Sequence, residues 1–131
     1  MITKILIFFL ISINSFALSE KDQQDVDKEK NDISQMIDHI KPMLSEMNQI
    51  QGACIALKKF MGKEECPQYS KQIQRKLKGL ENSLGEQKHA FFSYLKGAIL
   101  FGYRCGSCDM ADHLKYCPMM ADLLSKYDYL K

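Results

Sequence analysis

Five cysteines and three histidines are the residues of this chain best suited to chemistry at a defined site. Cys54 and Cys66 lie in the middle of the sequence, whereas Cys105, Cys108 and Cys117 form a cluster nearer its C-terminus. Thiols pair as disulfides, attack other disulfides as thiolates or bind soft metal ions. Because five is an odd number, one thiol is left over when the others pair within the chain.

The C-terminal cluster supports four interpretations, of which structural disulfides are the one we favour. The sequence Cys105-Gly-Ser-Cys108 resembles the Cys-x-x-Cys motif of thiol oxidoreductases, in which a thiolate at a helix N-terminus attacks a disulfide. The set Cys105, Cys108, His113 and Cys117 is similar to a zinc knuckle, with His113 and Cys117 one helical turn apart. Cu(I) is a further alternative, because soft ligands recur at helical spacing in two sets: Met36, His39, Met43 and Met47, and Met110, His113, Cys117 and Met120.

Among the disulfide pairings we favour Cys54 with Cys66. The turn at Gly62 would bring the ends of two helices within the roughly 6 Å that a disulfide requires between Cα atoms. The three remaining cysteines would then form one bond and leave one thiol, either buried or free for an intermolecular disulfide. A bond from Cys66 to Cys105 would require a break near Gly85, since one straight helix would separate them by about 58 Å.

Apolar residues recur at spacings of three and four over residues 32–61, which predicts an amphipathic helix. Asp32, with Gln35 three residues later, resembles a capping box and predicts its start. Pro42 is expected to kink or divide this helix, because proline lacks an N–H donor and clashes with the preceding turn. Pro67 is well placed to open the next helix.

The stretch 67–101 has helical spacing again and forms either one helix or two, with Ser83 and Glu86 as a candidate cap for a second start. In the last segment, 107–131, Ser107 is the predicted N-cap and Pro118 is expected to separate two short helices. No segment alternates with a period of two, as a half-buried strand would. We therefore predict an all-α antiparallel bundle of three to five helices, stapled by one or two disulfides.

The N-terminus predicts export. Residues 1–17 combine Lys4, the apolar run Ile5–Ile13, and the small residues Ser15 and Ala17 before a cleavage site, which is the pattern of a signal peptide. Its removal would leave 114 residues, enough for one helical domain, predicted over 32–131 after an acidic arm over 18–31 that is either flexible or a solvated extension of the next helix. We expect a secreted or periplasmic protein without a membrane span in the mature chain.

Charge and motifs exclude several functions. A net charge of +2 gives no reason to expect nucleic acid as a partner. The sequence lacks a nucleophile elbow, a phosphate loop and a zinc-protease motif, so we expect no catalytic residues and no cofactor, and an enzyme is not the favoured class. Residues 57–90 carry eight basic and four acidic residues, and Arg75, Lys76 and Lys78 form a small basic patch within them.

The favoured function is a binding module for another protein, such as an envelope or secretion-assembly accessory, a toxin-neutralising protein or a secreted factor. The first alternative is a carrier of small apolar ligands. It rests on two cysteine spacings, Cys66-x38-Cys105 and Cys108-x8-Cys117, that resemble those of helical exported odorant-binding proteins. Four aromatic residues would line its cavity: Phe91, Phe92, Tyr94 and Phe101. The second alternative is thiol redox or metal chemistry at Cys105, Cys108 and Cys117.

Overall fold

The structure, a computed structural model, describes residues 20–130, so the predicted signal peptide over 1–17 lies outside the described residues. The described part contains four α-helices: α2 (Glu20–Ala56), α3 (Cys66–Leu84), α4 (Ser93–Cys105) and α5 (Met110–Ser125). Three short 3-10 helices accompany them: η1 (Leu57–Phe60), η2 (Ala90–Phe92) and η3 (Asp128–Leu130). Residues 20–130 contain no strand, which confirms the all-α prediction. The described residues divide between two units, with the boundary between Met36 and Ile37.

The described residues of the first unit are helical from Glu20, so the predicted start at Asp32 is wrong. Neither glycine nor proline interrupts residues 20–32, and most of their side chains are lysine, glutamate, glutamine or aspartate. Lysine, glutamate and glutamine are good helix formers, and all four side chains stay hydrated on a helix without packing. Gln23 Nε2 donates a hydrogen bond to Asp27 Oδ1 one turn later, at 3.3 Å. The acidic segment is thus a solvated extension of α2.

Neither internal proline ends its helix. Helix α2 continues through Pro42 and α5 continues through Pro118, so the predicted division of the last segment into two helices does not occur. Ile40 and Met43 on either side of Pro42 are both buried. Packing of such neighbours outweighs the local penalty of proline, which is about 3 kcal/mol in a helix interior.

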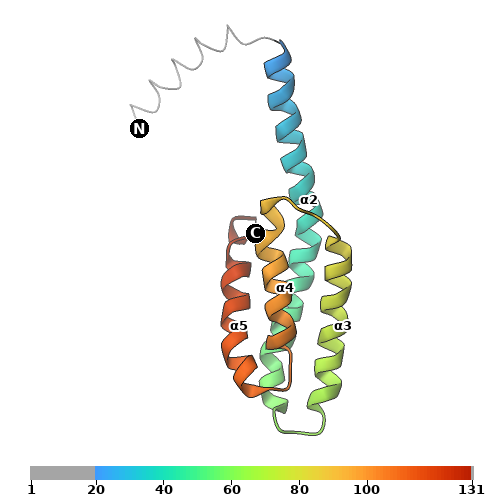
Figure 1. Ribbon diagram of the computed structural model, residues 1–131, viewed down its shortest axis with the longest axis vertical. Coiled ribbons are helices and arrows are strands. Elements are labelled where there is room, and N and C mark those ends of the chain that lie inside the picture. Colours follow the sequence, from blue (N-terminus) through green and yellow to red (C-terminus); the bar gives the residue numbers. More distant parts are fainter. Residues whose placement is uncertain (1–19, 131) are drawn as a thin grey trace, which may run out of the picture. The chain divides into compact units, whose positions relative to one another are not determined.

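The break in the stretch 67–101 falls at Gly85, where φ is +61° and a side chain would be strained. Helix α3 ends there, and α4 begins only after η2. The cap lies at η2 rather than at Ser83: His89 caps η2, because its Nδ1 accepts a hydrogen bond from the Phe91 amide at 3.0 Å. Helix α4 then runs back beside α3, and α5 runs back beside α4 (Figure 1).

Both ends of α4 are held by side chains from other elements. At its C-terminus, Ser70 Oγ donates to the Gly106 carbonyl at 2.5 Å, and Gln74 Nε2 donates to the Tyr103 carbonyl at 3.0 Å. At its N-terminus, the Tyr127 hydroxyl accepts from the Leu95 amide at 3.0 Å and donates to the Phe91 carbonyl at 2.6 Å. These bonds satisfy helix-end groups that would otherwise lack partners. They set the position of Cys105, the last residue of α4.

Candidate functional site

The turn between α4 and α5 brings together most of the cysteines. Cys105 ends α4 and is fully buried, while Cys108 is exposed in the turn. Asp109, not the predicted Ser107, caps α5, because its Oδ1 accepts a hydrogen bond from the Asp112 amide at 2.9 Å. Helix α5 therefore begins at Met110, and Cys117 within it bonds to Cys105.

Two disulfides form, and neither is the pairing that the sequence favoured. Cys66 bonds to Cys108 and Cys105 bonds to Cys117, with Cα–Cα distances of 6.0 and 4.7 Å. The predicted Cys54–Cys66 bond is wrong because the break at Gly85 returns the chain to the N-terminal end of α3. Cys66 thereby acquires a partner that is distant in sequence.

The unpaired cysteine is Cys54, not a member of the C-terminal cluster. Its side chain is fully buried, and burial raises the pKa of its thiol to about 12. A neutral, buried thiol is a poor nucleophile, so Cys54 is not positioned to form an intermolecular disulfide from the folded state. Within the cluster of three, one bond forms as expected, between Cys105 and Cys117, while Cys108 pairs outside the cluster with Cys66.

His113 lies against the Cys105–Cys117 disulfide and is only 4 % exposed. Its Nδ1 is 2.9 Å from the Cys105 carbonyl oxygen and 3.4 Å from Cys117 Sγ. A disulfide sulfur carries no hydrogen, so in this state Nδ1–H is the donor and the carbonyl oxygen is the acceptor. One candidate ligand atom from each of Cys105, His113 and Cys117 lies within 4.8 Å of the other two. Of the four predicted zinc ligands, the structure thus brings three together and places Cys108 in the other disulfide.

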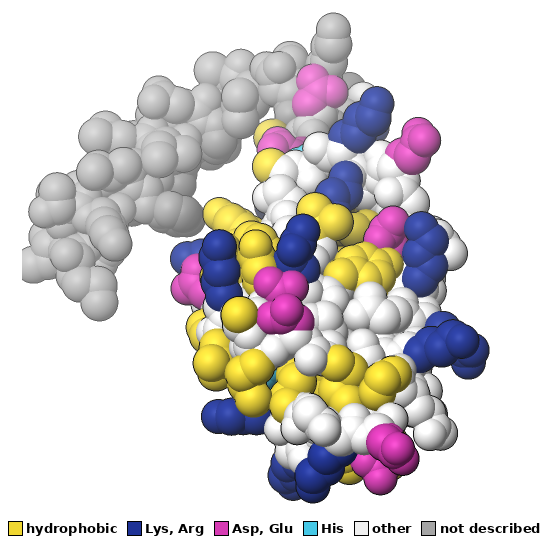
Figure 2. All heavy atoms as spheres, turned by 60° about the horizontal axis from the view of Figure 1, so that its bottom comes forward, with side chains coloured by type: hydrophobic (Ala, Val, Ile, Leu, Met, Phe, Trp, Pro, Cys, Tyr) yellow, Lys and Arg dark blue, Asp and Glu magenta, His cyan; other side chains and the backbone are white. Residues whose placement is uncertain are grey.

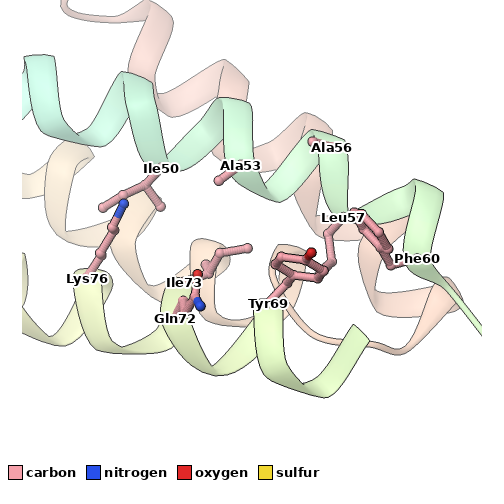
Figure 3. Close-up of a pocket in the computed structure, with 9 residues that line it drawn as sticks. All are labelled: Ile50, Ala53, Ala56, Leu57, Phe60, Tyr69, Gln72, Ile73 and Lys76. Atoms are coloured by element: carbon pink, nitrogen blue, oxygen red, sulfur yellow. The ribbon is translucent and has the colours of Figure 1, made fainter. Parts of the chain in front are cut away.

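A second candidate site is an apolar groove of about 250 Å³, which sequence reasoning missed. It lies between the C-terminal part of α2 with η1 and the first half of α3 (Figure 3). Its only charged lining residue is Lys76, which reaches into one end of the groove, while Phe60 and Tyr69 close the other with ring centroids 4.4 Å apart. Nine residues line it: Ile50, Ala53, Ala56, Leu57, Phe60, Tyr69, Gln72, Ile73 and Lys76.

Small side chains on α2 create this groove. Ala53 and Ala56 are exposed at its wall, in the part of the helix that follows the buried Met47 and Ile50. A helix face normally packs large apolar side chains against its neighbour, so small residues leave a gap between two helices. The run Gly52-Ala53 followed by Ala56 was the available signal in the sequence.

The three residues of the predicted basic patch do not act as one surface. Lys76 lines the groove, whereas Lys78 pairs with Glu81 at 3.2 Å, and Arg75 is exposed. The aromatic residues expected to line a ligand cavity do not share one surface. Phe92 is buried, whereas Tyr94 is 44 % exposed.

Comparisons with known proteins do not indicate a class for this protein. No family model, no curated protein and no solved structure matches the chain. Among the helices of the described residues, none combines the length and the apolar character that crossing a membrane requires.

Proposed function

We propose that this chain is an exported binding module that docks an acidic amphipathic helix of a partner protein in the α2–α3 groove. The observation that carries the proposal is the groove itself, an apolar surface open to solvent with a cation at one end. In helix-in-groove recognition, apolar side chains of the partner enter such a surface and its charged side chains pair with the rim. Export is supported by the N-terminal sequence pattern and by two disulfides, which persist in oxidising compartments.

The size of the groove suits two apolar side chains. A volume of about 250 Å³ holds roughly eight water-sized groups at ~30 Å³ each. Two leucine side chains supply eight carbon atoms, and leucines at positions i and i+4 of a helix lie on one face. A partner helix with such a pair would fill the floor beside Ala53 and Ile73.

The charge around the groove favours an acidic partner. Helix α3 carries four basic residues and one acidic residue, Glu81, which is already paired with Lys78. Its other cations are exposed: Lys71, Arg75 and Lys76. Figure 2 shows exposed hydrophobic side chains on one face of the molecule, with both Lys or Arg and Asp or Glu side chains around them. The exposed cations of α3 accelerate encounter with an acidic helix and disfavour a basic one.

A labelled peptide tests the proposal. The probe is a helix-forming peptide with leucines at i, i+4 and i+7 and glutamates flanking them, and binding is followed by fluorescence anisotropy. Ala53→Leu narrows the groove and should weaken binding at least about tenfold, equivalent to 1.4 kcal/mol. Ala111→Leu is the matched control, because Ala111 is an exposed helical alanine outside the groove.

A charge reversal at the rim tests the electrostatic contribution to binding separately from the apolar contacts in the groove. Lys76→Glu should weaken the glutamate peptide and strengthen a lysine-flanked version, whereas Lys88→Glu, at an exposed position outside the groove, should change neither. Equal binding of the peptide by the native protein and by Ala53→Leu would refute the proposal. Native mass spectrometry that finds a small apolar ligand bound to the purified protein, and lost from Ala53→Leu, would refute it in favour of the carrier function.

A further inference from the structure

A buried imidazole beside two sulfurs is the most chemically capable cluster among the described residues. Cys105 is fully buried, His113 is nearly so and Cys117 is half-buried. The cluster comes from two elements that are held by several contacts, namely the C-terminus of α4 and one face of α5. None of its members lines the α2–α3 groove, so the following inference is independent of the proposed function.

We propose that the reduced Cys105–His113–Cys117 cluster is a Cu(I) site and that the Cys105–Cys117 disulfide is its closed form. Two thiolates and one imidazole form a soft donor set, which favours Cu(I). Zinc sites take four ligands, and a three-residue catalytic site completes its shell with water. Three ligands are sufficient for Cu(I), so this cluster can hold the ion without the water that zinc would require.

The distance between His113 and Cys117 already matches that between two ligands of one metal ion. With metal–sulfur bonds of about 2.3 Å and metal–nitrogen bonds of about 2.0 Å, two ligands of one ion lie roughly 3.5–4 Å apart. His113 Nδ1 and Cys117 Sγ are 3.4 Å apart, so these two need little movement. The two sulfurs separate once their bond is broken, and Cys117, being half-buried, has room on its solvent side.

Opening the site requires a reductant, for which a dithiol is sufficient. The dithiol transfers two electrons and two protons to the disulfide, becomes a disulfide itself and leaves Cys105 and Cys117 as thiols. Binding of Cu(I) then displaces the two thiol protons. His113 must present a lone pair at Nδ1, so its N–H moves to Nε2 and the hydrogen bond from Nδ1 to the Cys105 carbonyl is given up.

The test is a Cu(I) titration of the purified protein, reduced with a phosphine and kept free of oxygen. A chromophoric Cu(I) chelator serves as competitor. We expect one Cu(I) per chain and an affinity at least about tenfold lower in His113→Gln and in Cys117→Ser. His89→Gln is the matched control at an exposed histidine, and the pair Cys66→Ser and Cys108→Ser tests the other disulfide. Both controls should bind as the native protein does.

Spectroscopy and folding provide independent readouts. X-ray absorption should report two sulfur ligands and one imidazole nitrogen in the native protein and lose the nitrogen in His113→Gln. A shell of three sulfurs, or equal copper affinity of His113→Gln and the native protein, would overturn the proposal. Circular dichroism should show helix in the reduced, copper-loaded protein. A reduced chain that unfolds and does not regain helix with Cu(I) would overturn it too.

Discussion

Removal of the Cys66–Cys108 disulfide should destabilise the domain more than removal of Cys105–Cys117. The two bonds span 42 and 12 residues of sequence. In the chain-entropy model, a cross-link over the longer loop contributes about 4 kcal/mol and one over the shorter loop about 3 kcal/mol. The expected difference of about 1 kcal/mol follows from the ratio of loop lengths alone. Four kcal/mol is a large share of the 5–15 kcal/mol that typically holds a domain folded.

The assay is equilibrium unfolding in guanidinium chloride, followed by circular dichroism, for the two paired alanine variants. Cys66 and Cys105 are both buried, so each variant also loses packed sulfur atoms. Unfolding in reductant corrects for this, because the native protein and the variants then all lack disulfides and differ only in packing. The difference between oxidising and reducing conditions isolates the cross-link.

The chain-entropy reasoning fails if the corrected loss for the long loop is below about 1 kcal/mol. It fails equally if the 12-residue bond proves the more stabilising of the two after correction. Either result would indicate that the unfolded chain already holds the cysteines close together.

Three further predictions concern single residues. The Cys54 thiol, with its pKa raised to about 12 by burial, should resist a thiol-reactive dye at pH 8 and react fully in denaturant; rapid native labelling would contradict its burial. Gly106→Ala should lower the stability of the fold by about 1–3 kcal/mol, because its Cβ would lie 2.6 Å from Ile73 Cγ2. Gly79→Ala has free space in α3 and should raise the stability by about 0.5–1 kcal/mol. Thermal melts that give the opposite order would refute the packing around Gly106. Burial and a hydrogen bond to Glu81 raise the pKa of Tyr103 from 10.0 to about 12. The neutral Tyr103 side chain therefore contributes its full stability below pH 10, and this contribution is lost as the pH rises toward 12. In a series of unfolding curves at increasing pH, Tyr103→Phe should lose less stability over this range than the native protein.

Local sequence signals predicted the elements better than their ends. The spacing of apolar residues correctly indicated helices and excluded strands, because a helical face must present its apolar side chains every three or four residues. Proline was misleading at Pro118, which lies inside α5 rather than between two helices, and α2 is likewise not divided at Pro42, since buried neighbours outweigh a local penalty. Pro67 succeeded because the first turn of a helix tolerates proline without loss of a hydrogen bond.

The candidate site was predictable as a set of residues but not as an arrangement. The sequence indicated that His113 and Cys117 share a helix face, which depends only on a spacing of four. It did not show that Cys105 completes the cluster while Cys108 leaves it, because that choice depends on where α4 ends relative to α3. The groove between α2 and α3 was not foreseen, since a gap is a property of two packed surfaces.

What the sequence by itself determined is therefore the helical class and the set of cysteines from which disulfides are drawn. Both follow from residue type and spacing along one chain. The tertiary structure alone decided which cysteines pair and which remains free. The break at Gly85 reverses the chain, brings Cys108 to Cys66 and leaves Cys54 buried without a bond. Such contacts join residues that are far apart in sequence, and their geometry depends on the packing of every helix between them.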